Sequence, residues 1–268
     1  IGVHAATILP MSVEPTWLIA ALCGFALLAG FVDAVVGGGG LIQIPALFVL
    51  LPDLAPATLL GTNKFASVWG TASATVQYLR RVPMEWRATL PTASSALLFG
   101  FLGARVAALL PADAFRPLIV ALLIGVLAYT LWKKDLGALH APHLSHRQQH
   151  WIGLATGAAI GFYDGFFGPG TGSFLVFAFV GLFGFSFLAA SASAKFVNVI
   201  TNLAALSYFA WAGHVRYDIA APMAVFNVAG SLVGSRMAIR KGSAFVRKLF
   251  IGIVGLLILR FAWDVWRG

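Results

Sequence analysis

The sequence has few charged residues and a single cysteine. Charged side chains make up 10% of the 268 residues and hydrophobic side chains 60%, whereas about a quarter of an average soluble domain is charged. Neither the one-sided helices nor the alternating strands of a soluble fold can be recognised. Cys23 stands alone in an apolar run, so a disulfide framework and a cysteine metal cluster are excluded. We interpret this residue as a small buried hydrophobe.

The apolar residues instead form long blocks that short polar joints separate. A helix of about 20 apolar residues spans the hydrocarbon core of a bilayer, and the blocks 17–36 and 114–132 have this length. We therefore predict an all-α, polytopic integral membrane protein, which we expect in the cytoplasmic (inner) membrane of a bacterium. The net charge of +9 lies largely in the joints, so membrane topology explains it better than nucleic-acid binding.

An offset of 131 residues aligns the two halves of the chain. The matched pairs include Gly30 and Gly161, Asp33 and Asp164, Gly37 and Gly168, Lys64 and Lys195, Pro91 and Pro222, and Arg105 and Arg236. Chance identity would not favour glycine, proline and the rare charges. We predict two homologous repeats, 14–134 and 148–267, joined by a histidine-containing cytoplasmic linker, 135–147.

Each half contains five apolar segments, of which the second is short. They cover 17–36, 41–51, 57–79, 88–110 and 114–132 in the first half, and 151–167, 172–185, 188–212, 219–239 and 244–266 in the second. If all five cross the membrane, the second half is inverted, as in many transporters. Ten crossings also gather most of the basic joints on one side, as cytoplasmic loops require. We expect ten spans with both termini outside; re-entrant second segments are the alternative.

Ionisable residues at membrane depth are candidates for function because burying them is costly. Lys64 and Lys195 lie well inside their segments, too deep for the ammonium group to reach the interface easily. Arg105 and Arg236 lie nearer segment ends, where they either bind substrate or extend to the interface. Asp33 and Asp164 each precede a glycine-rich break, and we expect them to neutralise the lysines or to accept coupling protons.

The two glycine-rich breaks are candidate anion sites. A broken helix leaves free N–H groups and a positive dipole end that bind oxyanions, and irregular backbone is tolerated in a membrane where it lines a cavity. Close packing of helices is the alternative. The break residues expected to bind substrate are Gly38, Gly39, Gly40, Gly170 and Thr171.

Polar residues accompany each lysine at helical spacing. They are Asn63, Ser67 and Thr71 in the first half, and Asn198 and Asn202 in the second. Residues three, four and seven positions apart share a helix face, so we expect these side chains to contact the substrate or to form hydrogen bonds between helices. The aromatic residues Phe65, Trp69, Phe166 and Phe196 are candidates to contact an organic substrate, or ordinary packing residues.

Counting two lysines, two arginines and two aspartates at membrane depth leaves two positive charges in excess. Such a cavity would favour an anion. No serine, histidine and aspartate set indicates a hydrolytic enzyme. His140, His143, His146 and His150 have spacing that can hold zinc, but no cysteine or carboxylate cluster completes a site. We therefore expect no metal and no cofactor.

The segment Gly30–Phe31–Val32–Asp33 followed by four glycines, its counterpart 161–172 and the later lysines resemble the TauE/SafE family of sulfite-exporter-like proteins. The resemblance covers nearly the whole chain and implies transport of sulfite, an organosulfonate or a related sulfur anion. We expect a secondary transporter that works by alternating access, with a passive anion channel or, more distantly, a membrane-embedded enzyme as alternatives. The expected partners are a small anion and the lipid bilayer, with assembly into a homo-oligomer left open.

Overall fold

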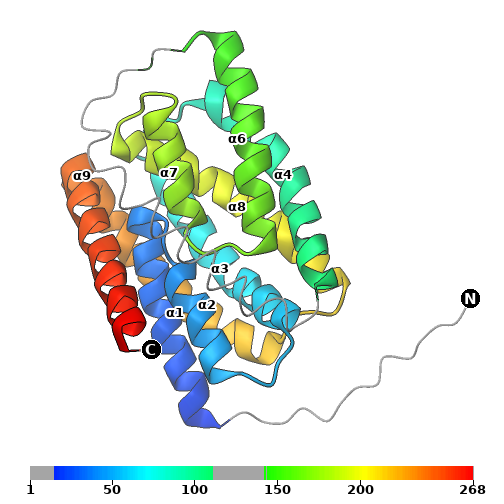
Figure 1. Ribbon diagram of the computed structural model, residues 1–268. Helices are drawn as coiled ribbons and strands as arrows, with labels where there is room; N and C mark the ends of the chain where they lie inside the picture. Colours follow the sequence, from blue (N-terminus) through cyan, green and yellow to red (C-terminus); the bar gives the residue numbers. More distant parts are fainter. Residues whose placement is uncertain (1–14, 111–141, 143, 268) are drawn as a thin grey trace, which may run out of the picture.

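The computed structural model describes residues 15–110, 142 and 144–267, with side chains described up to residue 242. These residues form eight helices and no strand. In chain order the helices are α1 (Thr16–Val36), α2 (Gly40–Leu50), α3 (Pro56–Leu79), α4 (Trp86–Leu109), α6 (His146–Phe166), α7 (Thr171–Gly181), α8 (Phe187–Trp211) and α9 (Tyr217–Arg267) (Figure 1). The expected segment 114–132 and most of the linker 135–147 lie outside the described residues.

Local chemistry explains where several helices begin and end. Helix α6 begins at His146, five residues before the expected segment, because Ser145 and Gln148 form a reciprocal capping box. Helix α3 begins at Pro56, whose fixed φ suits a first helical position. Helix α1 ends at Gly37, which adopts a left-handed φ of 83° that few other residues tolerate. The glycine-rich breaks therefore interrupt the helices where we expected.

Helix α9 contains two expected segments, 219–239 and 244–266. Its backbone is interrupted at Gly242, where φ is 71° and ψ is −170°. Such a conformation is open to glycine and strained for a residue with a side chain. The expected joint between the two segments is thus present as a glycine-centred break, at which two helical segments of α9 meet.

The helices and their contacts repeat with the offset found in the sequence. Helix α2 begins at Gly40 and α7 at Thr171, 131 residues later, and the same interval separates the starts of α3 and α8. Contacts between the halves are reciprocal as well: Gly30 packs on the backbone of Asn227, and its counterpart Gly161 packs on the backbone of Ala96, the counterpart of Asn227. A two-fold relation between the halves produces reciprocal contacts of this kind.

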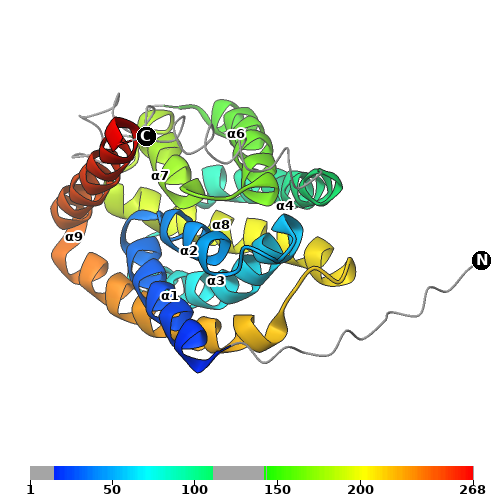
Figure 2. The same cartoon turned by 60° about the horizontal axis from the view of Figure 1, so that its bottom comes forward.

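The helices form two outer pairs around a central pair. Helix α1 packs along α9, α4 packs along α6, and α3 and α8 lie between these pairs (Figure 2). Gly157 contacts Thr92, Gly161 contacts Ala96 and Gly165 contacts Gly100. Because the residue numbers rise together along both helices, α4 and α6 are parallel. Figure 1 shows that α1 and α6, the first helices of the two halves, run in opposite directions.

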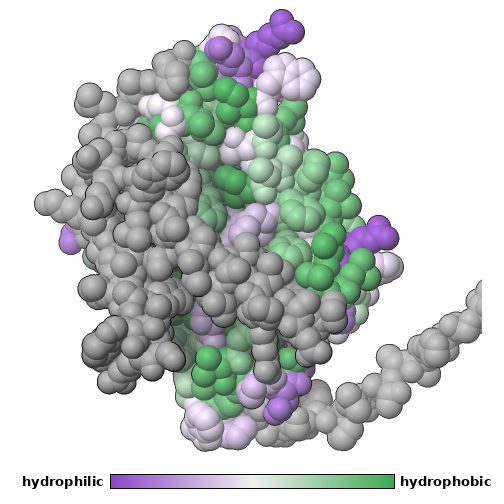
Figure 3. All heavy atoms as spheres, viewed as in Figure 1, coloured by the Kyte–Doolittle hydropathy of each residue, from purple (hydrophilic) through white to green (hydrophobic). Residues whose placement is uncertain are grey.

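The exterior is apolar and much of the polar side-chain content is inside. Trp151 and Trp211 are 61% and 81% exposed, whereas Gln43, Thr92 and Lys195 are fully buried. Figure 3 shows apolar residues covering much of the described surface on one face. Four described helices are long and apolar enough to cross a bilayer, and α2 and α7 are shorter apolar helices of 11 residues each. This distribution is that of a multi-pass membrane protein.

Glycine at position 165 permits the close approach of α6 and α4. A side chain there would collide with the carbonyl oxygen of Gly100. We expect Gly165→Ala to lower the free energy of unfolding by about 1–3 kcal/mol through overpacking, measured as a lower thermal midpoint in detergent. The matched control is Gly24→Ala, since nothing lies within 4 Å of a side chain at Gly24. A Gly165→Ala protein as stable as the control would contradict this account of the packing.

Candidate functional site

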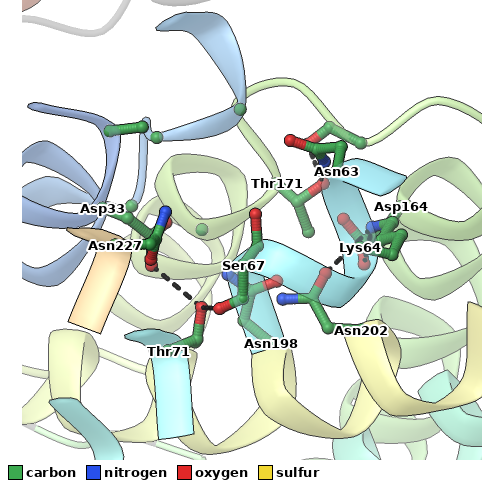
Figure 4. A pocket seen from close by; sticks show the side chains of 16 residues that line it. Asp33, Asn63, Lys64, Ser67, Thr71, Asp164, Thr171, Asn198, Asn202 and Asn227 are labelled. Atoms are coloured by element: carbon green, nitrogen blue, oxygen red, sulfur yellow. Dashed lines mark hydrogen bonds and ion pairs between the residues drawn. The ribbon is translucent and has the colours of Figure 1, made fainter. Parts of the chain in front are cut away.

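Four helix ends meet around one polar cavity between the halves. Helix α1 ends and α2 begins on one side of it, and α6 ends and α7 begins on the other. The central helices α3 and α8 supply most of the polar side chains (Figure 4). The cavity has a volume of about 20 Å³, which accommodates one or two water molecules. The cavity is therefore narrow in this structure.

The first charged group at this cavity is an ion pair between the halves. The Lys64 Nζ atom, on α3, lies 2.7 Å from Asp164 Oδ2, on α6. Their side chains are only 3% and 2% exposed. Lys64 also donates a hydrogen bond of 3.1 Å to Asn202 Oδ1, on α8. Both members of the pair line the cavity, so a ligand there meets a positive and a negative charge together.

The second ion pair is the counterpart of the first in sequence but differs in exposure. The Lys195 Nζ atom lies 3.1 Å from Asp33 Oδ2, and Thr71 donates a 3.3 Å hydrogen bond to the same oxygen. Asp33 is 15% exposed and lines the cavity, whereas Lys195 is completely buried and is not part of the lining. Only the carboxylate of this pair therefore faces the cavity.

The charge of the site differs from the expected excess of two positive charges. Each aspartate neutralises the lysine of the other half, which was one of the two roles we expected for it. Arg105 and Arg236, which supplied the expected excess, are exposed and lie outside the cavity lining. The cavity lining thus holds one lysine and two aspartates, and the second aspartate is paired with a lysine that lies behind it.

The structure brings most of the predicted site residues together. The cavity lining includes Asp33, Gly39, Gly40, Asn63, Lys64, Ser67, Thr71, Asp164, Thr171, Asn198 and Asn202. Figure 4 shows Lys64, Asp164 and Asn202 at one end, Asp33, Thr71 and Asn227 at the other, and Ser67 and Asn198 between them. The predicted residues outside the lining are Gly38, Gly170, Lys195, Arg105 and Arg236.

The four aromatic candidates lie outside the polar cavity. Phe65 and Trp69 line a separate apolar hollow of about 410 Å³ against α9, and Trp69 is 54% exposed. Phe196 packs edge-on against Trp86. Phe166 stacks on Phe162, with the ring centroids 6.1 Å apart. Phe166 and Phe196 are therefore packing residues, whereas Phe65 and Trp69 face the apolar hollow.

Asn227 lines the cavity but was not identified by aligning the two halves of the sequence. It lies on α9 and donates a 2.8 Å hydrogen bond from Nδ2 to Oε1 of Gln43, on α2. The counterparts at the 131-residue offset are Ala96 and Phe174, so the repeat does not mark either residue. Each residue could have been noticed as an amide side chain within an apolar segment, because burying a polar group in a membrane costs free energy and such residues are often functional.

Hydrogen bonds join the two glycine-rich breaks. Ser173 donates from its backbone N–H to Gly37 O at 3.1 Å and from its hydroxyl to Val36 O at 3.0 Å. A side chain on Gly37 or on Gly172 would collide with the backbone of the other. The first turns of α2 and α7 are thereby held at the cavity, with their positive dipole ends toward it.

Among the described lining residues, one buried polar side-chain atom has neither a hydrogen bond nor an ion-pair partner. Asn63 is 4% exposed, and its Oδ1 atom makes no hydrogen bond. Buried polar atoms are nearly always satisfied, so the Asn63 amide is a candidate to contact a ligand or a water molecule in the cavity. Rotation of the amide would present its two N–H donors instead.

The histidines do not form a metal site within the described residues. His146 contacts the Arg87 guanidinium at 2.7 Å, and His150 packs against Trp151. No group of three potential metal ligands occurs in the part of the chain that the structure describes. His140 and His143 lie outside that part.

The apolar exterior, the repeated helix pattern and the polar cavity between the halves define a class of protein: a multi-pass membrane protein with a polar site in its interior. The model of the sulfite exporter TauE/SafE family matches residues 22–261. The chain therefore belongs to this family, which places it among membrane transporters rather than enzymes.

Relatives of known sequence agree with this assignment. The chain is similar to the probable membrane transporter protein ORF9 of Sinorhizobium sp., with 36% identity over 92% of this chain and 93% of the relative. It is 33% identical to the probable membrane transporter protein YfcA of Escherichia coli K12, over 92% and 90% of the two chains. A probable membrane transporter protein of Haemophilus influenzae is 32% identical over 92% and 95%. No solved structure matches the chain.

Proposed function

We propose that this protein is a secondary transporter of a small sulfur-containing oxyanion, either sulfite or an organosulfonate, in the inner membrane of a bacterium. The observation that carries the proposal is the polar cavity at which Lys64 and the starts of α2 and α7 converge. An ammonium group and the positive dipole ends of helices are suited to an anion. The family name supports a sulfur oxyanion as the substrate.

The side chains around Lys64 suit an anion with several oxygen atoms. Asn63, Ser67 and Thr171 line the cavity beside it and carry N–H or O–H donors. An anion with three oxygens around sulfur can accept from several of these donors at once while one oxygen pairs with Lys64. Because the lining is polar throughout, an organic body would have to be small or extend into space that opens with the cavity.

For the architecture we propose two inverted halves of five segments each. The opposite directions of α1 and α6 and the reciprocal contacts between the halves support this layout. The parallel arrangement of α4 and α6 supports it too, because a further crossing is then needed between them. Contact between Arg87 and His146 puts the basic α3–α4 joint and the start of α6 on one side, as the positive-inside rule expects.

Transport in this proposal proceeds by alternating access. A cavity of about 20 Å³ is too small for sulfite, so binding requires the halves to move apart at one side. The Lys64–Asp164 contact joins the halves and lies in the cavity wall, which makes its opening part of substrate entry. Rocking of one half against the other then exposes the site to either side in turn.

Counterflow in proteoliposomes tests the function. Vesicles loaded with unlabelled sulfite or methanesulfonate are expected to take up the same labelled anion faster than empty vesicles. The reason is that internal anion lets the binding site return to the outside in its occupied form. A passive channel shows no such stimulation, so the measurement separates the two. Lack of counterflow with both anions would refute the proposed substrate class, and recovery of a chemically altered anion would indicate an enzyme.

A further inference from the structure

The Lys64–Asp164 pair sets a charge balance that any bound anion disturbs. Each side chain is almost fully buried, and the two charged groups are 2.7 Å apart. An anion that pairs with Lys64 takes the place of the Asp164 carboxylate. Asp164 is then left in the interior without a counter-charge. A carboxylate in that position is strongly disfavoured and is neutralised by taking up a proton.

Among the residues that the structure describes, the groups that face Asp164 offer no alternative counter-charge. Lys64 faces it from α3, with Asn202 from α8 beside the ammonium group. On α6 itself, the Tyr163 hydroxyl donates to Pro169 O at 2.6 Å. Arg105, on the neighbouring α4, is exposed. Once an anion occupies Lys64, a neutral carboxyl group is the form of Asp164 that these surroundings stabilise.

An anion in the cavity does not disturb the second ion pair, Lys195–Asp33. Lys195 is completely buried and lies outside the lining, so an anion in the cavity does not reach its ammonium group. Asp33 therefore keeps both Lys195 and the hydrogen bond from Thr71 when the site is occupied. Of the two aspartates, Asp164 is the one whose charge depends on the substrate.

A proton fits the space better than a metal cation does. A metal ion would need several oxygen ligands around it in addition to the anion. A proton on a carboxylate oxygen occupies no further volume. It also requires no rearrangement of the neighbouring groups.

We propose that Asp164 binds one proton for each anion bound at Lys64, so that a monovalent anion and a proton cross the membrane together without net charge. This inference rests on the proposed function. The proton comes from water on the side to which the site is open and bonds to a carboxylate oxygen. It is released when the anion leaves and the ion pair with Lys64 forms again.

The test uses the full chain in proteoliposomes with labelled methanesulfonate, which carries no proton that titrates near neutral pH. Sodium is absent, and potassium with valinomycin holds the voltage at zero. With the outside one pH unit more acidic, the wild-type protein is expected to accumulate the anion about ten-fold. Asp164→Asn is expected to lose this accumulation and still exchange labelled for unlabelled anion, because asparagine stays neutral. The matched control Asp53→Asn, in an exposed loop, should accumulate as the wild type does.

Several results would overturn the coupling. These are accumulation by Asp164→Asn, no response of the wild type to the pH gradient, and a requirement for sodium. If Asp164→Asn does not fold, the voltage dependence of the wild type decides: uptake that an imposed voltage does not change supports cotransport with a proton, and uptake driven by voltage refutes it. Counterflow without proton coupling would leave the proposed function standing, whereas missing counterflow would refute both.

Discussion

Lys64→Ala is expected to abolish counterflow and to weaken binding of sulfite by two orders of magnitude or more. Truncating one partner of a buried charge pair in a binding site typically costs about 2–5 kcal/mol, and about 1.4 kcal/mol corresponds to a ten-fold change in affinity. The structure places this ammonium group in the cavity wall with 3% of the side chain exposed. Binding measured by thermal shift and by calorimetry checks the result.

Two further variants make the Lys64 result specific. Because Lys64→Ala leaves Asp164 without its partner, the double variant Lys64→Ala/Asp164→Asn restores the charge balance and should fold, yet still fail to bind the anion. Arg105→Ala removes a positive charge that is exposed outside the cavity and should bind nearly as the wild type does. Unchanged affinity in a folded Lys64 variant would defeat the assignment of the site.

Lys195→Met is expected to cause a large loss of stability, about 3–5 kcal/mol, because it leaves the Asp33 carboxylate largely buried without its counter-ion. Lys195 is completely buried, and its ammonium group is 3.1 Å from Asp33. The double variant Lys195→Met/Asp33→Asn removes both charges and should recover most of the loss. The thermal midpoint in detergent provides the measurement.

The same double variant separates two roles of Lys195. If Lys195 only stabilises the fold by pairing with Asp33, the Lys195→Met/Asp33→Asn protein should bind the anion far better than the Lys64→Ala/Asp164→Asn protein does. If Lys195 binds the anion directly, as its position in the repeat suggested, the two double variants should lose affinity equally. The burial of Lys195 outside the lining favours the first result.

Much of the fold follows from local sequence. The break after α1 lies in a run of four glycines, and α2 begins at Gly40 as expected within one residue. The expected joint near 240 is present as the break at Gly242. The early start of α6 was missed because hydropathy does not detect a capping box, in which Ser145 and Gln148 satisfy backbone and side-chain groups in a polar stretch.

The sequence identified many of the residues that line the cavity, but it did not predict how their charges are paired. Rare charges at membrane depth identified Lys64 and Asp164, and helical spacing identified Ser67 and Asn202, all of which line the cavity. Spacing along one helix does not show which partner from another helix will neutralise a charge. From the sequence, Asp164 could either neutralise a lysine or accept a coupling proton. The repeat also suggested the same role for Lys64 and Lys195, although the structure shows that only Lys64 lines the cavity.

The sequence by itself determined that the chain is a helical membrane protein of two related halves, because hydrophobic length, glycine breaks and a constant offset are properties of the chain alone. Only the tertiary structure decided that each lysine pairs with the aspartate of the other half. It also decided that Lys195 is hidden and that Asn227 joins the cavity. These features depend on distances between helices far apart in the chain, which the packing of α1 on α9 and of α4 on α6 establishes.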